Sequence, residues 1–369
     1  MERRARLPQL QEAPLPADVN PELLRLLRCP ACKSRLSRRE DELRCSTCGK
    51  TYPIVLGIPD LRVYEDPLIP LQDDYRKGEK VQVEAERLNF AELVRYYWSL
   101  PTYPYTPPDL KERFIRQVLS QEDRVRETFS SSIGRGQTFL EAGCGTASLL
   151  RVVSSRFGLA VGCDVAFRWL LIARKGLQEA GLPVNLVCCC ADYLPFPDEA
   201  FSSVAAVSLL EHVPDAGAVI SEFDRVMRKE GSIFVYTSNR FSLGPEPHVR
   251  VWGVGFLPRR WMSTYVKWVR KIPYEKKRLL SRFEVRRLFR KVGLDSLEFS
   301  LPAITAADRK KLRGLEKYGA RLFTWLGHVP FVRPFLLVVS PVIQVVARRT
   351  RTNPAQIADA LASAMSRRA

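Results

Sequence analysis

The stretch that decides the fold is Phe139-Leu-Glu141-Ala-Gly143-Cys-Gly145-Thr-Ala147, an apolar run that ends in two closely spaced glycines. A strand that ends in such a turn and leads into a helix presents backbone N–H groups to a ligand. A dinucleotide fits this turn poorly, because Ser148 stands at the place of the third glycine and Glu141 would repel a pyrophosphate. We therefore expect a ligand that carries positive charge.

Short apolar runs alternate with helical patterns from residue 137 onward. The runs are Thr138–Gly143, Leu159–Asp164, Val184–Cys190, Ser202–Leu209 and Ser232–Tyr236. Alternation of this kind is typical of a parallel, doubly wound α/β sheet. Leu294–Leu301 and Val342–Arg348 supply two more runs, so the sequence predicts seven strands.

Acidic residues follow the second and third of these runs. Asp164 lies 21 residues past Gly143, where a carboxylate can accept hydrogen bonds from both hydroxyls of a ribose. Asp192 and Tyr193 follow the third run, where an adenine would lie. Because the carboxyl ends of parallel strands meet in one crevice, we expect one ligand site there. Its predicted residues are Glu141, Gly143, Cys144, Gly145, Asp164, Asp192, Tyr193 and Leu209.

S-adenosylmethionine, which carries an ammonium and a sulfonium, fits this set of acids. Over about residues 137–240 the order of motifs resembles the class I S-adenosylmethionine-dependent methyltransferases, and the resemblance implies a Rossmann-like, seven-stranded, mostly parallel sheet. The segments from Asp192 to Phe201 and from Leu210 to Asp215 resemble the methyltransferase type 11-like subgroup that includes the ubiquinone and menaquinone enzymes. Ala147 departs from the usual third glycine, and Ser202 from the usual acid.

Glu211 and His212 follow the fourth run, beside the expected methyl group. An imidazole titrates near neutrality, so His212 is a candidate general base toward a hydroxyl, and His248 is a second candidate. In ubiquinone-pathway O-methyltransferases a Glu-x-x-Glu-His pattern holds Mg(II); here Ser208 replaces the first acid, so one oxygen ligand is missing. A structural role for the Glu211–His212 pair, such as capping the next helix, is the alternative.

Four cysteines near the N-terminus form two pairs, Cys29-Pro-Ala-Cys32 and Cys45-Ser-Thr-Cys48. Four thiolates at this spacing predict a structural, tetrahedral Zn(II) site, and two disulfides are the alternative. The flanking residues 20–30 and 52–61 resemble the zinc-ribbon family typified by the activator of tRNA and protein methyltransferases. By contrast, Cys188, Cys189 and Cys190 are consecutive on a predicted strand, point to alternating faces and are interpreted as core.

The whole chain has 369 residues, 46% of them hydrophobic, and a net charge of +18. This composition excludes wholesale disorder and favours polyanionic partners. The N-terminus has no apolar signal segment, and prolines break the apolar stretch from Leu322 to Ala347, so we expect a cytoplasmic protein, peripheral at a membrane. The predicted units are an N-terminal tail and zinc ribbon (1–62), a helical connector (63–133) and a methyltransferase domain (134–369). Helices are predicted over Ala85–Leu100 and Pro108–Thr128.

Two insertions are expected in the last unit, near 241–281 and 303–341. Between Arg250 and Lys291 there are 14 Lys or Arg residues against two acids. Interleaved aromatics are Trp252, Phe256, Trp261, Tyr265, Trp268 and Tyr274. Such a segment suits single-stranded RNA, an anionic membrane, or a basic face with its aromatics packed inward. Further apolar residues, Phe331, Phe335, Leu336 and Leu337, favour the membrane.

The sequence therefore predicts a methyltransferase that acts on a small-molecule, lipid or lipid-linked acceptor, with an anionic membrane surface as a partner. The alternative is a methyltransferase for ribosomal or other RNA that uses the ribbon and the basic insertion to bind RNA. A third hypothesis, a catalytically silent scaffold, is disfavoured by the intact set of Glu141, Asp164 and Asp192.

Overall fold

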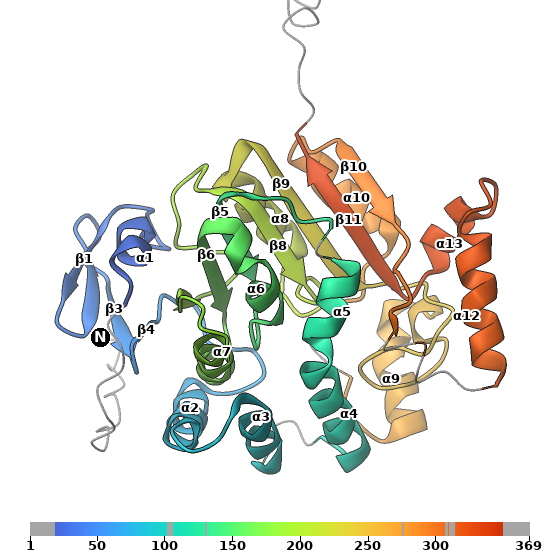
Figure 1. Cartoon of the computed structure of the whole chain (residues 1–369), viewed down its shortest axis with the longest axis horizontal. Helices are drawn as coiled ribbons and strands as arrows, with labels where there is room; N and C mark the ends of the chain where they lie inside the picture. The colour runs from blue at the N-terminus through green and yellow to red at the C-terminus, as the bar shows by residue number, and fades with distance from the viewer. Residues whose placement is uncertain are drawn as a thin grey trace, which may run out of the picture.

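The computed structural model describes residues 19–101, 106–129, 131–274, 277–306, 309 and 314–349. Its centre is a seven-stranded sheet in the order β10-β11-β9-β8-β5-β6-β7 (Figure 1). β11 runs antiparallel to both of its neighbours, and the pairs from β9 to β7 are parallel, so the predicted mostly parallel α/β sheet is confirmed. The strands are β5 (Gly136–Ala142), β6 (Phe157–Asp164), β7 (Leu186–Cys188), β8 (Phe201–Val207), β9 (Met227–Ser238), β10 (Ser296–Ser300) and β11 (Val342–Arg348).

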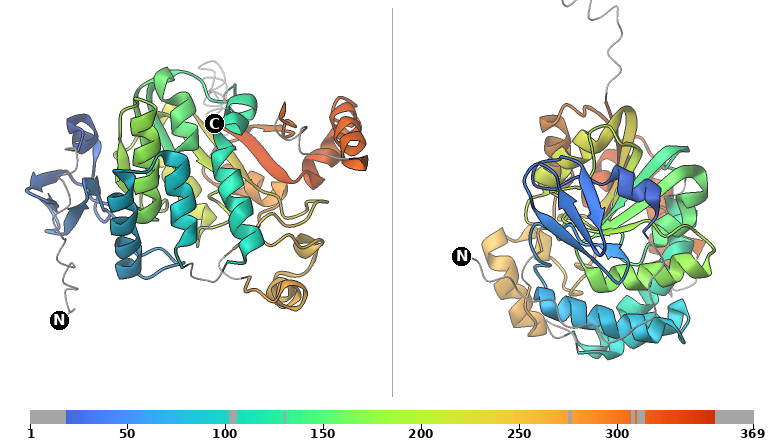
Figure 2. Two further views of the ribbon diagram at one scale, coloured as in Figure 1. Left: turned by 60° about the horizontal axis from the view of Figure 1, so that its bottom comes forward. Right: turned by 90° about the vertical axis from the view of Figure 1, so that its left-hand side faces the viewer.

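Helices cover both faces of this sheet (Figure 2). One face packs against α8 (Ala216–Val226) and α10 (Arg282–Lys291), and the other against α6 (Ser148–Val153) and α7 (Phe167–Glu179). A short 3-10 turn, η1 (Ser154–Arg156), follows α6. Successive side chains on a strand point to opposite faces, so on β5 Phe139 joins the second core and Leu140 the first. The three consecutive cysteines after residue 187 are buried, as predicted.

Four helices connect the N-terminal region to the sheet: α2 (Leu71–Ala85), α3 (Phe90–Ser99), α4 (Pro108–Leu119) and α5 (Gln121–Thr128). The helix predicted over Ala85–Leu100 begins only at Phe90. The reason is a capping box at Asn89, whose side chain accepts the N–H of Glu92 at 3.0 Å while the Glu92 carboxylate accepts the N–H of Asn89 at 2.9 Å. The helix predicted over Pro108–Thr128 is divided at Ser120 into α4 and α5.

The N-terminal region is a small antiparallel sheet in the order β1-β2-β3-β4, preceded by one helix. Its elements are α1 (Pro21–Leu26), β1 (Leu36–Arg39), β2 (Glu42–Cys45), β3 (Thr51–Val55) and β4 (Ile58–Pro59). It packs against the β7 edge of the large sheet, where the Leu61 N–H donates to the Cys188 carbonyl at 2.8 Å. Leu23, Leu27 and Leu43 belong to the same buried cluster as Val161 of β6, so the two sheets share a core.

The segments between β9 and α10 and between β10 and β11 lie together at the opposite end of the molecule (Figure 1). They contain η2 (Val254–Phe256), α9 (Arg259–Arg270), α12 (Leu315–Leu326) and α13 (Arg333–Val339). Trp252, Trp261 and Trp268 are 63%, 56% and 79% exposed, so the alternative in which the aromatics pack inward is wrong for them, although Tyr274 is buried.

The apolar residues expected to face a membrane are only partly exposed. Phe331 and Phe335 are exposed, but Leu336 is buried and therefore adds nothing to the surface. Within the described part of the chain, no helix combines the length and the apolar character that crossing a bilayer requires.

Candidate functional site

The glycine loop connects β5 to α6 and leaves room beside it. Gly143 and Gly145 have positive φ angles of 68° and 50°. A Cβ on Gly143 would lie 2.8 Å from Leu209 Cδ1, whereas no atom lies within 4 Å of the Cβ position at Gly145. Leu209 thus packs tightly on the first glycine, and the open space at the second is a cradle that a ligand can fill.

Asp164 stands at the end of β6 and holds this loop. Its two carboxylate oxygens accept the N–H groups of Gly145 and Ala166, each at 2.8 Å. Burial raises the pKa of Asp164, while these two backbone bonds lower it in part. A carboxylate oxygen has a second lone pair, so both oxygens keep acceptor capacity for the hydroxyls of a bound ribose.

Asp192, after β7, is tied to a residue that the sequence gave no reason to select. The Tyr64 hydroxyl donates to Asp192 Oδ1 at 2.6 Å, across 128 positions of the chain. Tyr193 is 43% exposed, and its ring meets the Tyr64 ring edge to face at 6.3 Å. Tyr64, a residue of the connector, therefore contacts both Asp192 and Tyr193, the two residues predicted to lie beside an adenine.

Glu141 and Cys144 turn into the protein. Glu141 is 3% exposed, and its Oε2 accepts the N–H of Leu150 in α6 at 3.0 Å. Burial raises the pKa of Glu141 to about 8. Cys144 is also buried, and burial raises the pKa of its thiol. In this structure both residues shape the loop from beneath.

A buried ionic network holds the connector against the cofactor side. Arg62 donates to Asp74 at 2.7 Å and to the Val165 carbonyl at 3.0 Å, directly after Asp164. Asp74 also accepts the backbone N–H of Phe167 at 3.0 Å, which satisfies the first turn of α7. Arg168 donates to the same carboxylate at 2.8 Å.

On the other side of the sheet's carboxyl end, the two predicted histidines meet. His212 Nε2 and His248 Nε2 are 3.2 Å apart. The Nδ1 of His248 lies 2.6 Å from Glu246 Oε1, and the other oxygen of Glu246 accepts the N–H groups of His248 and Val249. If both rings are neutral, the Glu246 contact assigns the proton of His248 to Nδ1, so that His212 Nε2 donates to His248 Nε2.

Glu211 supports this pair from below. It is fully buried and accepts hydrogen bonds from the Thr237 hydroxyl at 2.6 Å and from the Ser238 hydroxyl at 3.0 Å. Burial would raise the pKa of Glu211, but His212, His248 and Thr237 together lower it. Burial lowers the pKa of His212 to about 4, which makes this imidazole neutral at physiological pH.

The donor atoms of Glu211, His212 and His248 lie within 4.8 Å of one another, close enough for three ligands of one metal ion. Two imidazoles suit a transition metal better than Mg(II). However, both oxygens of Glu211 already accept hydrogen bonds, and a direct hydrogen bond accounts for the contact between the rings.

A cavity of about 1000 Å³ opens beside the two histidines. Its lining includes Ser208, His212 and His248. Its aromatic walls are Tyr97, Trp98, Phe114, Trp169 and Tyr236. The cavity therefore opens beside the predicted base, and Ser208 is the chain neighbour of Leu209, which packs on Gly143.

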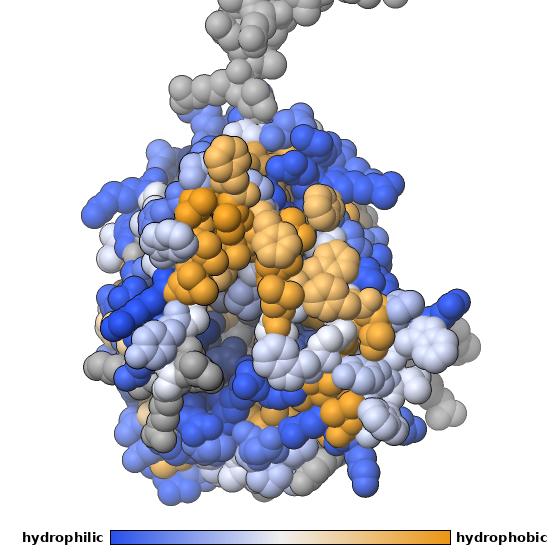
Figure 3. Space-filling model, turned by 90° about the vertical axis from the view of Figure 1, so that its right-hand side faces the viewer, coloured by the Kyte–Doolittle hydropathy of each residue, from blue (hydrophilic) through white to orange (hydrophobic). Residues whose placement is uncertain are grey.

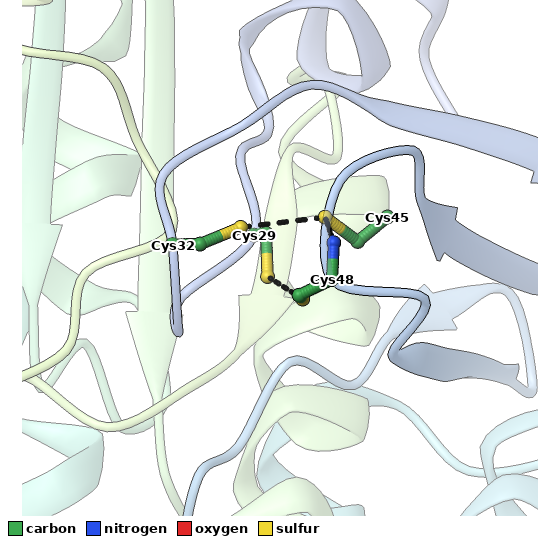
Figure 4. Close-up of side chains that lie close together, drawn as sticks. All are labelled: Cys29, Cys32, Cys45 and Cys48. Atoms are coloured by element: carbon green, nitrogen blue, oxygen red, sulfur yellow. Dashed lines mark hydrogen bonds between the residues drawn. The ribbon is translucent and has the colours of Figure 1, made fainter.

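The four N-terminal cysteines converge on one point (Figure 4). The Sγ atoms of Cys29 and Cys48 are 3.6 Å apart, and those of Cys32 and Cys45 are 3.4 Å apart. Sulfurs around a tetrahedral Zn(II) are about 3.8 Å apart, given Zn–S bonds of about 2.3 Å. The Cys48 N–H also points to Cys45 Sγ at 3.5 Å. All nine cysteines are free, so the disulfide alternative is wrong.

Comparison with known proteins matches two parts of the chain to known families. Residues 140–235 match the family described as methyltransferase domain, and residues 20–57 match the family described as Trm112p-like protein. A ubiquinone biosynthesis O-methyltransferase of Idiomarina loihiensis is 26% identical over 60% of this chain and 84% of its own length. A phosphatidylethanolamine N-methyltransferase of Cereibacter sphaeroides is 37% identical over 34% of this chain and 62% of its own length, less than two thirds.

Among solved structures, a complex of the Haloferax volcanii Trm112 methyltransferase activator with a methyltransferase is 16% identical, with 72% of this chain and 99% of that chain covered, at a TM-score of 0.42. A likeness of this degree says nothing about function. Two family matches, the sheet order and the cysteine cluster agree with one another. Residues 140–235 therefore form a class I S-adenosylmethionine-dependent methyltransferase domain, and a Trm112p-like region with a four-cysteine cluster lies ahead of it.

Proposed function

We propose that this methyltransferase transfers the methyl group to a hydroxyl of a small-molecule or lipid-linked acceptor that binds in the cavity beside His212. The observation that carries the proposal is that one cavity is lined both by the His212–His248 pair and by Ser208, whose chain neighbour Leu209 packs on Gly143. The names of the relatives, which include enzymes of ubiquinone and phosphatidylethanolamine methylation, support a small-molecule or lipid acceptor.

The glycine loop and the acids around it would hold S-adenosylmethionine. The open side of Gly145 receives the ligand, Asp164 accepts from its ribose, and Asp192 with Tyr193 lies at its adenine. When bound, the cofactor supplies an electrophilic methyl group on a sulfonium. Transfer is an in-line displacement, so the protein contributes mainly proximity and alignment.

His212 is the proposed general base. It is neutral at physiological pH and can accept the proton that the acceptor hydroxyl loses. Burial and the nearby His248 and Lys277 disfavour the charge formed on it, and the carboxylates of Glu211 and Glu246 offset this in part. Glu246 acts through His248 and is a positioning residue, because its carboxylate fixes the orientation of that ring.

An anionic membrane is the proposed partner of a surface that we call the aromatic face (Figure 3). It consists of the exposed residues Trp252, Phe256, Trp261, Trp268, Tyr318, Leu322, Trp325, Phe331 and Phe335. Exposed cations, among them Lys267 and Arg321, stand on the same helices, and α9 contains no acidic residue. Aromatic rings at headgroup depth with cations beside them match an anionic bilayer.

Two measurements test these proposals together. The full chain is incubated with methyl-labelled S-adenosylmethionine and separate lipid, small-molecule and RNA fractions; label in RNA alone would instead support the RNA alternative.

Anionic vesicles should shift tryptophan fluorescence to the blue, neutral vesicles should do so much less, and W261A/W268A should lose the response. A response to a single-stranded oligonucleotide alone would overturn the membrane proposal.

We also propose that the four-cysteine cluster holds one structural Zn(II). Elemental analysis should find one zinc per chain and none in Cys29→Ser. Cys190→Ala is the matched control, since Cys190 lies outside the cluster and should leave the zinc in place. Because the N-terminal region shares a core with the large sheet, loss of zinc should lower the stability of the whole chain. Full zinc content in Cys29→Ser would contradict the assignment.

A further inference from the structure

The cavity beside His212 has a strongly cationic wall. Its lining includes Lys77, Arg113, Arg116, Arg124, Arg168 and Lys277, and no acidic residue is among the described residues that line it. Part of this charge is already neutralised, because Arg168 pairs with Asp66 and Asp74, each at 2.8 Å. Lys277 and Arg113 are different in this respect, and both lie beside the histidine pair: Lys277 affects the charge of His212, and Arg113 bonds to the residue before His248.

Lys277 follows α9 and is largely withdrawn from solvent. Among the described residues, none places a carboxylate within ion-pair distance of its Nζ, and its nearest ring contact is Tyr274, with the centroid at 5.9 Å. Burial lowers the pKa of Lys277, while the more distant charges of Glu246 and Glu211 raise it in part. A buried ammonium that lacks a close counter-ion is costly and favours an anionic ligand.

Arg113 reaches the same place from α4. Its guanidinium donates to the carbonyl of Pro247, the residue before His248, which fixes the head group beside the histidine pair. Burial lowers the pKa of Arg113, and the positive charge of Arg250 lowers it further. A planar guanidinium with four other N–H groups matches the oxygens of a phosphate or carboxylate.

We propose that Lys277 and Arg113 bind an oxyanion, a phosphate or a carboxylate, carried by the methyl acceptor. This inference rests on the proposed function, because it takes the cavity as the acceptor site. The oxyanion neutralises the two cations and fixes one end of the acceptor, while the aromatic walls around Trp98 and Trp169 contact its apolar part. Its hydroxyl is then held near His212, where alignment counts most for the rate.

The test is calorimetry on the full chain saturated with S-adenosylhomocysteine. Inorganic phosphate, phenyl phosphate and benzoate are titrated as probes, with benzyl alcohol as the neutral control. We expect both aromatic anions to bind more tightly than benzyl alcohol, and the ratio between phenyl phosphate and benzoate tells which oxyanion the site prefers. Lys277→Met should weaken binding of the preferred anion by about tenfold to a hundredfold, and Lys277→Arg by less than about threefold.

Lys229→Met is the matched control, because Lys229 is exposed on β9 and lies outside the cavity lining. It should leave anion binding unchanged. Equal losses in Lys277→Met and Lys229→Met would show attraction to general positive charge and overturn the proposal. If Lys277→Met binds S-adenosylhomocysteine normally and the preferred anion as tightly as the wild type does, the oxyanion proposal is overturned and the cofactor site stands. If the wild type fails to bind S-adenosylhomocysteine, the proposed cofactor site is overturned. An unchanged melting temperature shows that each variant is folded.

Discussion

The two halves of the site are assembled in different ways. The cofactor side takes Gly143, Asp164, Asp192 and Leu209 from the ends of four strands that follow one another along the chain. The acceptor side takes its residues from stretches as far apart as Leu68 and Val342. The cofactor side is thus an outcome of the sheet order, while the acceptor side depends on how the connector and the late segments pack on that sheet.

Their charges are opposite as well. Beside the glycine loop the acids are Asp164 and Asp192, and the one arginine that donates to the loop, Arg151, is paired with Glu122. The ionisable side chains that line the proposed acceptor cavity are mainly cations. A positively charged donor and a negatively charged acceptor would each bind on the side of opposite charge, with the methyl group between them. The difference therefore supports a division of labour, which the following changes can break or sharpen.

The largest effect is expected on the acceptor side, for His212→Ala. Without the imidazole the acceptor hydroxyl loses its proton to water, so kcat should fall by about 10²-fold to 10⁴-fold. Affinity for S-adenosylmethionine should stay the same, because no hydrogen bond connects His212 with the glycine loop among those described. Single-turnover kinetics on the fraction that accepts label measures the first value and calorimetry the second. An unchanged kcat would leave His212 a structural role only.

The next expected effect is on stability, and here the two halves respond to pH with opposite signs. The pKa of His212 is lowered from 6.5 to about 4 in the folded chain. The contribution of this histidine to the unfolding free energy is therefore complete above pH 6.5 and is lost as the pH falls toward 4. The pKa of Glu141 is raised to about 8 from 4.5, so its contribution is complete below pH 4.5 and is lost as the pH rises toward 8.

Comparison with His212→Gln isolates the histidine. Between about pH 7.5 and about pH 5 the wild type should lose about 2 kcal/mol more unfolding free energy than the variant, because the contribution of Glu141 is common to both. Urea unfolding at the two pH values measures the difference. A wild type and a variant with the same pH dependence would show that His212 titrates normally.

The residues proposed for the cofactor side could be expected near one another from sequence, because their signals are local. The apolar runs, the glycine pair and the acids at the strand ends all lie within about one strand–helix unit of each other, and the strands Val342–Arg348 and Ser296–Ser300 also formed where apolar runs predicted them. Helix bounds differ more from the prediction, because the Asn-x-x-Glu capping box at Asn89 starts a helix inside the range Ala85–Leu100 that the apolar spacing predicts as one helix.

The acceptor side could be predicted only in part. His212 and His248 are 36 positions apart, and nothing in their spacing indicates that their rings touch. Glu246 and Lys277 look like ordinary surface charges in a basic segment until burial separates them from the rest. The contact of Tyr64 with Asp192 has no local signal at all, because it arises from the packing of the connector on the sheet edge.

An effect of similar size is expected on the cofactor side, for Asp164→Ala. Removing the carboxylate removes charge-assisted hydrogen bonds to the ribose, which should weaken S-adenosylmethionine binding by about 1.5–3 kcal/mol. Calorimetry measures this loss, and Asp198→Ala is the control, because Asp198 is an exposed partner of Arg225 away from the loop. The same affinity in both variants would remove Asp164 from the cofactor site.

The smallest effect tests whether the cofactor side is as local as its sequence signals suggest. Tyr64→Phe keeps the ring that meets Tyr193 but removes the hydroxyl that donates to Asp192. Asp192 then loses one partner and is held less firmly, so affinity for S-adenosylmethionine should fall by about 1 kcal/mol, which is about fivefold. Tyr193→Phe is the control, since the Tyr193 hydroxyl has no hydrogen bond to Asp192 among those described.

Thermal unfolding separates this effect from general damage, because the loss of one half-buried hydroxyl should change the melting temperature by only a few degrees. A fivefold loss in Tyr64→Phe and none in Tyr193→Phe would mean that the connector, and with it the N-terminal region that leads into it, tunes the cofactor side. Equal affinities in both variants would mean that only residues at the strand ends determine cofactor binding. The contrast between a cofactor side built from neighbouring strand ends and an acceptor side built from distant segments would then have no exception.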